Sequence, residues 1–135
     1  MTKQTILTIA RQTTTQHGWF VRVVLAPVGS RSYLAQCRRL SLGSRVHWEL
    51  ALAARYWYNV RDTPSNRELL VRTVLHEIAH RRHFSLRDPH SEKWAVEFLY
   101  LLNQHFPPEK VVLYFRMTGA LTLAECDELL ANWYY

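Results

Sequence analysis

Two histidines and a glutamate in the middle of the chain constrain its fold and chemistry more than any other feature. His76, Glu77 and His80 form the pattern H-E-x-x-H. On an α-helix, residues four positions apart project from the same face, so both imidazoles can bind one divalent ion, usually zinc. Glu77 then lies beside the open coordination position, where it can accept a proton from a metal-bound water. The pattern therefore predicts a helix that carries a hydrolytic metal site.

Apolar residues around this motif recur at helical spacing, which predicts that the motif helix is largely buried. They are Leu69, Leu70, Val71, Val74, Leu75, Ile78 and Ala79. Ser65 or Asn66, directly after Pro64, is the expected N-cap. A surface helix with two solvated histidines would lack such an apolar frame, so the metal interpretation is favoured.

A catalytic metal site needs a third protein ligand, and the sequence offers three candidates. His83 lies seven residues after His76, roughly 10 Å along a straight helix, which is too far for one ion. Glu97 would supply a carboxylate from the next helix. His90 is the favoured candidate, with Glu97 and His83 kept as alternatives.

The case for His90 comes from the helix that is expected to begin beside it. Asp88 and Pro89 predict an N-cap and a first helical residue, and hence a second helix over about 89–105 with His90 in its first turn. The core-facing stripe of that helix would then be His90, Trp94, Phe98 and Leu101. His90 should therefore point at the core on which the motif helix packs. A carboxylate from Asp88, Glu92 or Glu97 is expected to orient one of the ligand imidazoles.

A second short pattern, His90-Ser91-Glu92-Lys93-Trp94, follows H-E-x-x-H after a brief insert. Together with the stretch from Leu69 to His80, it resembles the SprT-like zinc metallopeptidases and is similar to the related WLM and YgjP-like metallopeptidases. Those families share H-E-x-x-H followed by H-[GS]-x-x-[FW], with the second histidine as third ligand. The resemblance covers about residues 45–100, and the two-part motif is fairly specific.

This resemblance implies a single SprT-like domain over residues 1–135 with an α+β, zincin-like fold. A small three-stranded sheet would pack on the motif helix and on a second helix, with further helices at the C-terminus. It also implies Zn²⁺ bound by His76, His80 and His90, Glu77 as the catalytic base, and a protein or peptide substrate. SprT-like proteins are associated with proteolysis of proteins bound or cross-linked to DNA, so non-specific DNA is an expected partner. This chain lacks the paired C-x-x-C motifs of the zinc ribbon that many of them carry, which weakens the DNA-directed role.

Three stretches before the motif are rich in β-branched and aromatic residues and are expected to form an antiparallel or mixed sheet. They are residues 19–26, 33–40 and 45–53. By resemblance, the last strand would be the sheet edge that lines the substrate cleft, where a peptide could add by main-chain hydrogen bonds. The remaining expectations are a short helix within 3–17 followed by a polar turn over 13–18, a helix over 108–117, and a last helix from the capping box Thr122–Glu125 to about Trp133.

Composition limits the class of protein further. The net charge of +6 and pI of about 9.7 favour a polyanionic partner, although no sequence-specific DNA-binding signature is present. Cys37 and Cys126 are isolated and are expected to be reduced thiols. The first residues lack a signal-peptide pattern, and no apolar run reaches the roughly 18 residues of a membrane span, so a cytoplasmic location is expected.

Two other function classes remain open from the sequence. A basic DNA-binding or interaction module could use the zinc structurally, and a fourth ligand such as His83 would favour that class. A zinc hydrolase acting on a non-peptide bond could use the same activated water. Neither the substrate nor the oligomeric state follows from the sequence.

Overall fold

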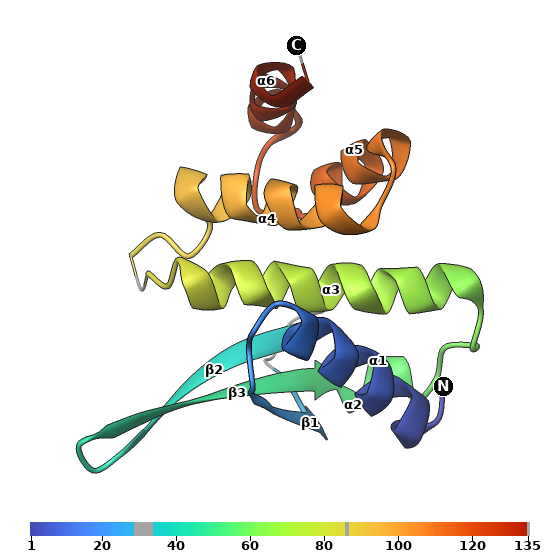
Figure 1. Cartoon of the computed structure of the whole chain (residues 1–135), viewed down its shortest axis with the longest axis vertical. Helices are drawn as coiled ribbons and strands as arrows, with labels where there is room; N and C mark the ends of the chain where they lie inside the picture. Colours follow the sequence, from blue (N-terminus) through green and yellow to red (C-terminus); the bar gives the residue numbers. More distant parts are fainter. Residues whose placement is uncertain (29–33, 86, 135) are drawn as a thin grey trace. The chain divides into compact units, whose positions relative to one another are not determined.

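The computed structural model describes residues 1–28, 34–85 and 87–134, and within these ranges the protein is α+β (Figure 1). The chain divides into two compact units, Met1–Ile78 and Ala79–Tyr135. The first contains the sheet, and the second is helical. Among the helices of the described ranges, none combines the length and the apolar character that crossing a membrane requires.

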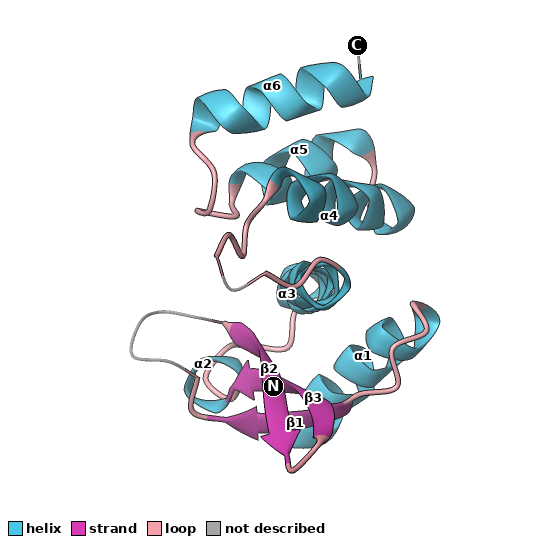
Figure 2. Cartoon of the chain, turned by 90° about the vertical axis from the view of Figure 1, so that its left-hand side faces the viewer, coloured by secondary structure: helices cyan, strands magenta, loops and turns pink. Residues whose placement is uncertain are grey.

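The sheet is mixed, with the strands β1 (Arg22–Ala26), β2 (Ala35–Leu42) and β3 (Arg45–Ala53) (Figure 2). Their order is β1-β3-β2, with β1 parallel and β2 antiparallel to β3. The expectation that the strand over 45–53 forms an edge is therefore wrong, because β3 is central. A tight turn makes β2 its antiparallel neighbour, and β1 occupies the other side.

The bounds of the strands follow from local hydrogen bonds and turns. β1 begins three residues later than expected because the Trp19 N–H donates to the Thr14 carbonyl (2.9 Å) and closes the preceding helix instead. β2 reaches Leu42, where Gly43 at φ +63° forms the turn into β3. The expected start of this strand, Tyr33, lies outside the described residues. β3 has the expected bounds.

Helix α1 (Lys3–Gln16) is longer than expected and includes most of the stretch predicted to be a polar turn. The Thr13 and Thr14 hydroxyls donate to the carbonyls of Ile9 and Arg11, which satisfies them within the helix. Helix α2 (Ala54–Trp57) follows β3 directly. The core of this unit contains Ile6, Ala10, Leu50, Ala51, Leu52 and Trp57, all without exposed surface.

Helix α3 (Pro64–Arg82) carries the H-E-x-x-H motif and runs through the boundary between the units. Its first residue is Pro64, because the Thr63 hydroxyl accepts the Asn66 N–H at 3.1 Å. The expected N-cap at Ser65 or Asn66 is therefore wrong by two or three residues. The apolar frame is confirmed at its centre, where Leu70, Val74, Leu75, Ile78 and Ala79 are buried.

The second unit continues with α4 (Glu92–His105), α5 (Pro108–Arg116) and α6 (Leu123–Tyr134). The Ser91 hydroxyl caps α4 by accepting the Trp94 N–H at 3.3 Å. The predicted N-cap at Asp88 and the placement of His90 within the helix are therefore wrong. The rest of the core-facing stripe is confirmed, since Trp94, Phe98 and Leu101 are fully buried. The capping box of α6 is confirmed by the two reciprocal bonds between Thr122 and Glu125.

Candidate metal centre

Three imidazoles come together at the end of α3. His76 and His80 are one helical turn apart on that helix, and the rings of His80 and His90 lie 4.6 Å apart between centroids. One ligand atom from each of His76, His80 and His90 lies within 4.8 Å of the other two. This cluster could hold a metal ion, and it consists of the three residues expected from the sequence.

His90 reaches the cluster from the turn before α4. The buried Trp94 ring contacts both histidines, stacked on His80 at 5.1 Å and edge-on to His90 at 4.6 Å. The imidazole of His80 is hydrogen-bonded to the backbone of Pro89, which has only a carbonyl to offer, so His80 donates one ring N–H there. A main-chain carbonyl therefore orients this imidazole, in the role predicted for a carboxylate, and leaves its other nitrogen to bind a metal.

The protonation states of His80 and His90 suit metal binding. Burial, and then the neighbouring His90, lower the pKa of His80 to about 4. Burial also lowers the pKa of His90, against a smaller opposing effect of Asp88. Both rings are therefore neutral near pH 7, and a neutral imidazole is the form that binds a metal.

Glu77 is almost completely buried, with 7% of its surface exposed. Its Oε2 accepts a hydrogen bond from the backbone N–H of Cys37 at 2.8 Å. Burial raises the pKa of Glu77 to about 8, while the Cys37 N–H and the charge of Arg72 act in the opposite direction. In the metal-free protein Glu77 is therefore largely protonated near neutral pH.

The sequence could not have indicated the contact with Cys37. The two residues are 40 positions apart, and the donor is a main-chain group that carries no side-chain signal. Cys37 and Cys126 are both reduced cysteines, as expected.

The alternative third ligands lie in a different group of side chains. Glu97 Oε1 is 3.5 Å from Arg82 Nη1 and 3.6 Å from His83 Nε2. The cluster that could hold a metal contains neither Glu97 nor His83. Both are therefore disfavoured as ligands.

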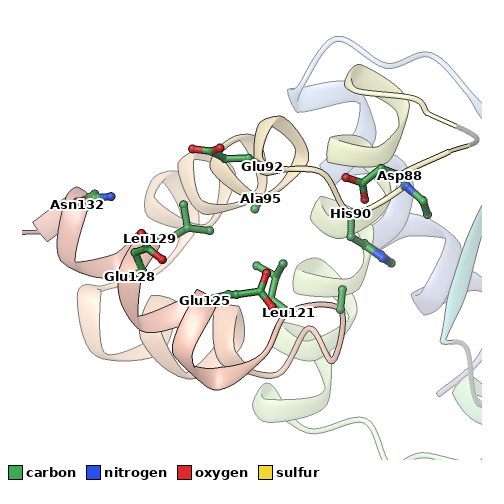
Figure 3. Close-up of a pocket in the computed structure, with 11 residues that line it drawn as sticks. Asp88, His90, Glu92, Ala95, Leu121, Glu125, Glu128, Leu129 and Asn132 are labelled. Atoms are coloured by element: carbon green, nitrogen blue, oxygen red, sulfur yellow. The ribbon is translucent and has the colours of Figure 1, made fainter.

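A pocket of about 470 Å³ in the second unit has His90 in its wall (Figure 3). Most of its surface is polar, and Ala95, Leu121 and Leu129 contribute the smaller, apolar part. The charged residues that line it are all acidic: Asp88, Glu92, Glu125 and Glu128. A pocket that combines four carboxylates with some aliphatic surface is complementary to the side chain of lysine or arginine, whose stem is apolar and whose end is positive.

Comparisons with known proteins identify no family. No family model, no curated protein and no solved structure matches this chain. Any assignment of function therefore depends on the site itself.

Proposed function

We propose that this protein is a zinc-dependent metallopeptidase of the SprT-like, zincin-like kind. The proposal rests on one observation. His76, His80 and His90 converge, and the buried residue Glu77 directly follows His76 in the chain. Three protein ligands are typical of catalytic zinc, because the fourth position is left for water, whereas structural zinc normally has four. The neutral imidazoles of His80 and His90, and the oriented ring of His80, fit Zn²⁺.

In this proposal the side chains have separate roles. The three imidazoles hold the ion, which when bound supplies a Lewis acid and a water of lowered pKa. Glu77 accepts the proton of the attacking water and delivers it to the amine leaving group. Glu77 follows His76 on α3, and the group of possible metal ligands does not include it.

The acidic pocket favours a particular class of peptide. Because the pocket and the proposed metal site share His90, a residue close to the scissile bond would enter it. The four carboxylates favour lysine or arginine there over a neutral side chain of similar length. Proteins that bind nucleic acids are rich in both residues.

The distribution of charge supports the DNA-linked form of the proposal. Residues 1–78 contain 11 lysines and arginines against 4 aspartates and glutamates, whereas residues 79–135 contain 6 against 7. Arg22, Arg39 and Arg45 are exposed on the strands, with Arg22 and Arg45 on one face of the sheet and Arg39 on the other. Exposed arginines can contact phosphate backbones without reading sequence.

Metal content and proteolysis test this function together. Mass spectrometry should find about one zinc per chain in the wild type and in His83→Ala, and little in His90→Ala. Hydrolysis of casein, with and without single-stranded DNA, should require zinc and be absent in Glu77→Gln. Zinc without hydrolysis, together with tight, salt-sensitive DNA binding, would support the structural-zinc module instead. A wild type that stays metal-free when zinc is supplied would refute both.

A further inference from the structure

The main-chain contact between β2 and Glu77 has a consequence for catalysis. We propose that the backbone N–H of Cys37 is a positioning group for Glu77, holding Oε2 so that proton transfer takes place at Oε1. This inference deepens the proposed function and depends on it. Cys37 itself does not touch the reacting atoms.

The geometry is that of a normal hydrogen bond. The distance of 2.8 Å between Cys37 N and Glu77 Oε2 lies within the range for N–H···O bonds in proteins. The bond is partly buried, where competition from water is reduced. It joins strand β2 to helix α3 across 40 positions of the chain, so a rigid element of the sheet restrains the carboxyl group.

The Cys37 N–H is directed away from the sheet. The Leu34 carbonyl accepts the Ala53 N–H, so this pair of opposite residues is a hydrogen-bonded one. Such pairs alternate along antiparallel strands. The backbone groups of even-numbered residues of β2 therefore bond to β3, and those of odd-numbered residues point to the open edge of the sheet. Cys37 is odd-numbered and lies opposite Leu50 in a pair that exchanges no ladder bonds. Its N–H can therefore serve Glu77 without any loss of pairing between β2 and β3.

A restrained base is what proton transfer requires. A glutamate side chain has three rotatable bonds, and a carboxyl group displaced by about 1 Å can lose on the order of 100-fold in rate. The Cys37 N–H fixes one oxygen, and the buried surroundings limit the remaining motion. Removing the donor should therefore lower kcat while leaving metal binding intact.

Amide hydrogen exchange tests the contact without any need for activity. Cys37 should exchange slowly in the wild type and in Glu77→Gln, which keeps an acceptor oxygen, and much faster in Glu77→Ala. Ser41, an odd-numbered residue of the same strand, is the internal reference and should not respond. Exchange at Cys37 that is as fast in the wild type as in Glu77→Ala would overturn the proposal.

Substitution by proline tests the role in catalysis, because proline has no N–H and is tolerated at strand edges. Cys37→Pro should have a kcat about 10- to 100-fold below that of Cys37→Ala, which lacks the thiol but keeps the donor. Zinc content and KM should be similar in the two variants. Ser41→Pro, which removes a donor from the same edge, should retain the wild-type kcat and controls for disturbance of the strand.

The outcomes separate this inference from the proposed function. Equal kcat values in Cys37→Pro and Cys37→Ala would overturn the positioning role while the peptidase assignment stands. If the wild type binds zinc but cleaves no peptide, the proposed function fails and the positioning role falls with it. Protection of the Cys37 amide would then identify the contact as a structural tie between β2 and α3. Loss of zinc in Cys37→Pro alone would also overturn the proposal, because the donor would then support the metal site instead of the base.

Discussion

Replacing Glu77 by glutamine should stabilise the metal-free protein, and the gain should grow with pH. The carboxyl group is buried, and its pKa is raised from 4.5 to about 8. The folded state therefore binds this proton more tightly than the unfolded state does, so the contribution of Glu77 to stability is lost as pH rises through the window from 4.5 to 8. Glutamine can still accept the Cys37 N–H and has no proton to lose.

The magnitude follows from the shift in pKa. One pKa unit corresponds to about 1.4 kcal/mol, so a shift from 4.5 to about 8 corresponds to on the order of 5 kcal/mol above pH 8. Below pH 4 the carboxyl group is protonated in both states, and this contribution vanishes. The lowered pKa of His80 has the opposite effect, since stability is lost as pH falls below 6.5 towards 4, but it is common to both proteins.

Urea unfolding of the wild type and Glu77→Gln, each with a chelator at several pH values between 4 and 9, measures this difference directly. The free energy of unfolding of the variant minus that of the wild type should rise by several kcal/mol across the range. Glu109→Gln, at an exposed position on α5, controls for the loss of a carboxylate and should give a flat difference. A flat difference for Glu77→Gln as well would refute the burial of an ionisable group at this position.

Three further predictions concern the metal and the substrate. Zinc should protect the wild type against thermal unfolding in proportion to the logarithm of its concentration, and His90→Ala should lose this protection while His83→Ala keeps it, as measured by melting curves. Zinc affinity should fall less between pH 7 and 5 than it does for a site of unperturbed histidines, because the pKa of His80 is lowered to about 4. Titration calorimetry at the two pH values measures this fall, and a steep loss of affinity would contradict the lowered pKa. Peptides with lysine or arginine near the scissile bond should be cleaved faster than peptides with norleucine there. Glu128→Gln should reduce that preference about 2- to 5-fold, as for an exposed ion pair. Equal cleavage rates for both peptides would show that the pocket does not bind the substrate side chain.

The sequence predicted the helices well because their signals are local. Apolar spacing located α3, and the capping box of Thr122 and Glu125 located the start of α6. The starts of α3 and α4 were missed because each is preceded by several residues that can cap a helix. Thr63 caps α3 and Ser91 caps α4, and only the folded chain decides which hydroxyl meets the free N–H groups.

The arrangement of elements that are far apart in the chain was harder to predict from the sequence. The pattern of β3 gave its bounds but not its central place, which depends on the parallel pairing with β1 across the sheet. His90 was placed on the wrong element and still reached the expected neighbours. A residue two positions before a helix lies close to the first turn of that helix, and the ring of Trp94 contacts both His80 and His90.

In the proposed site, burial sets the protonation states of both the base and two of its neighbouring metal ligands. The same removal from water that keeps His80 and His90 neutral also keeps Glu77 protonated, so without an ion these three side chains carry little charge. A divalent cation would reverse this balance at Glu77, because a nearby positive charge favours the carboxylate. The residue would become a base only when the metal is bound. Burial of the Glu77 carboxyl group costs stability, and its role as a base once metal is bound explains why it is buried. The N–H of Cys37 is the contact that would hold this carboxyl group in place.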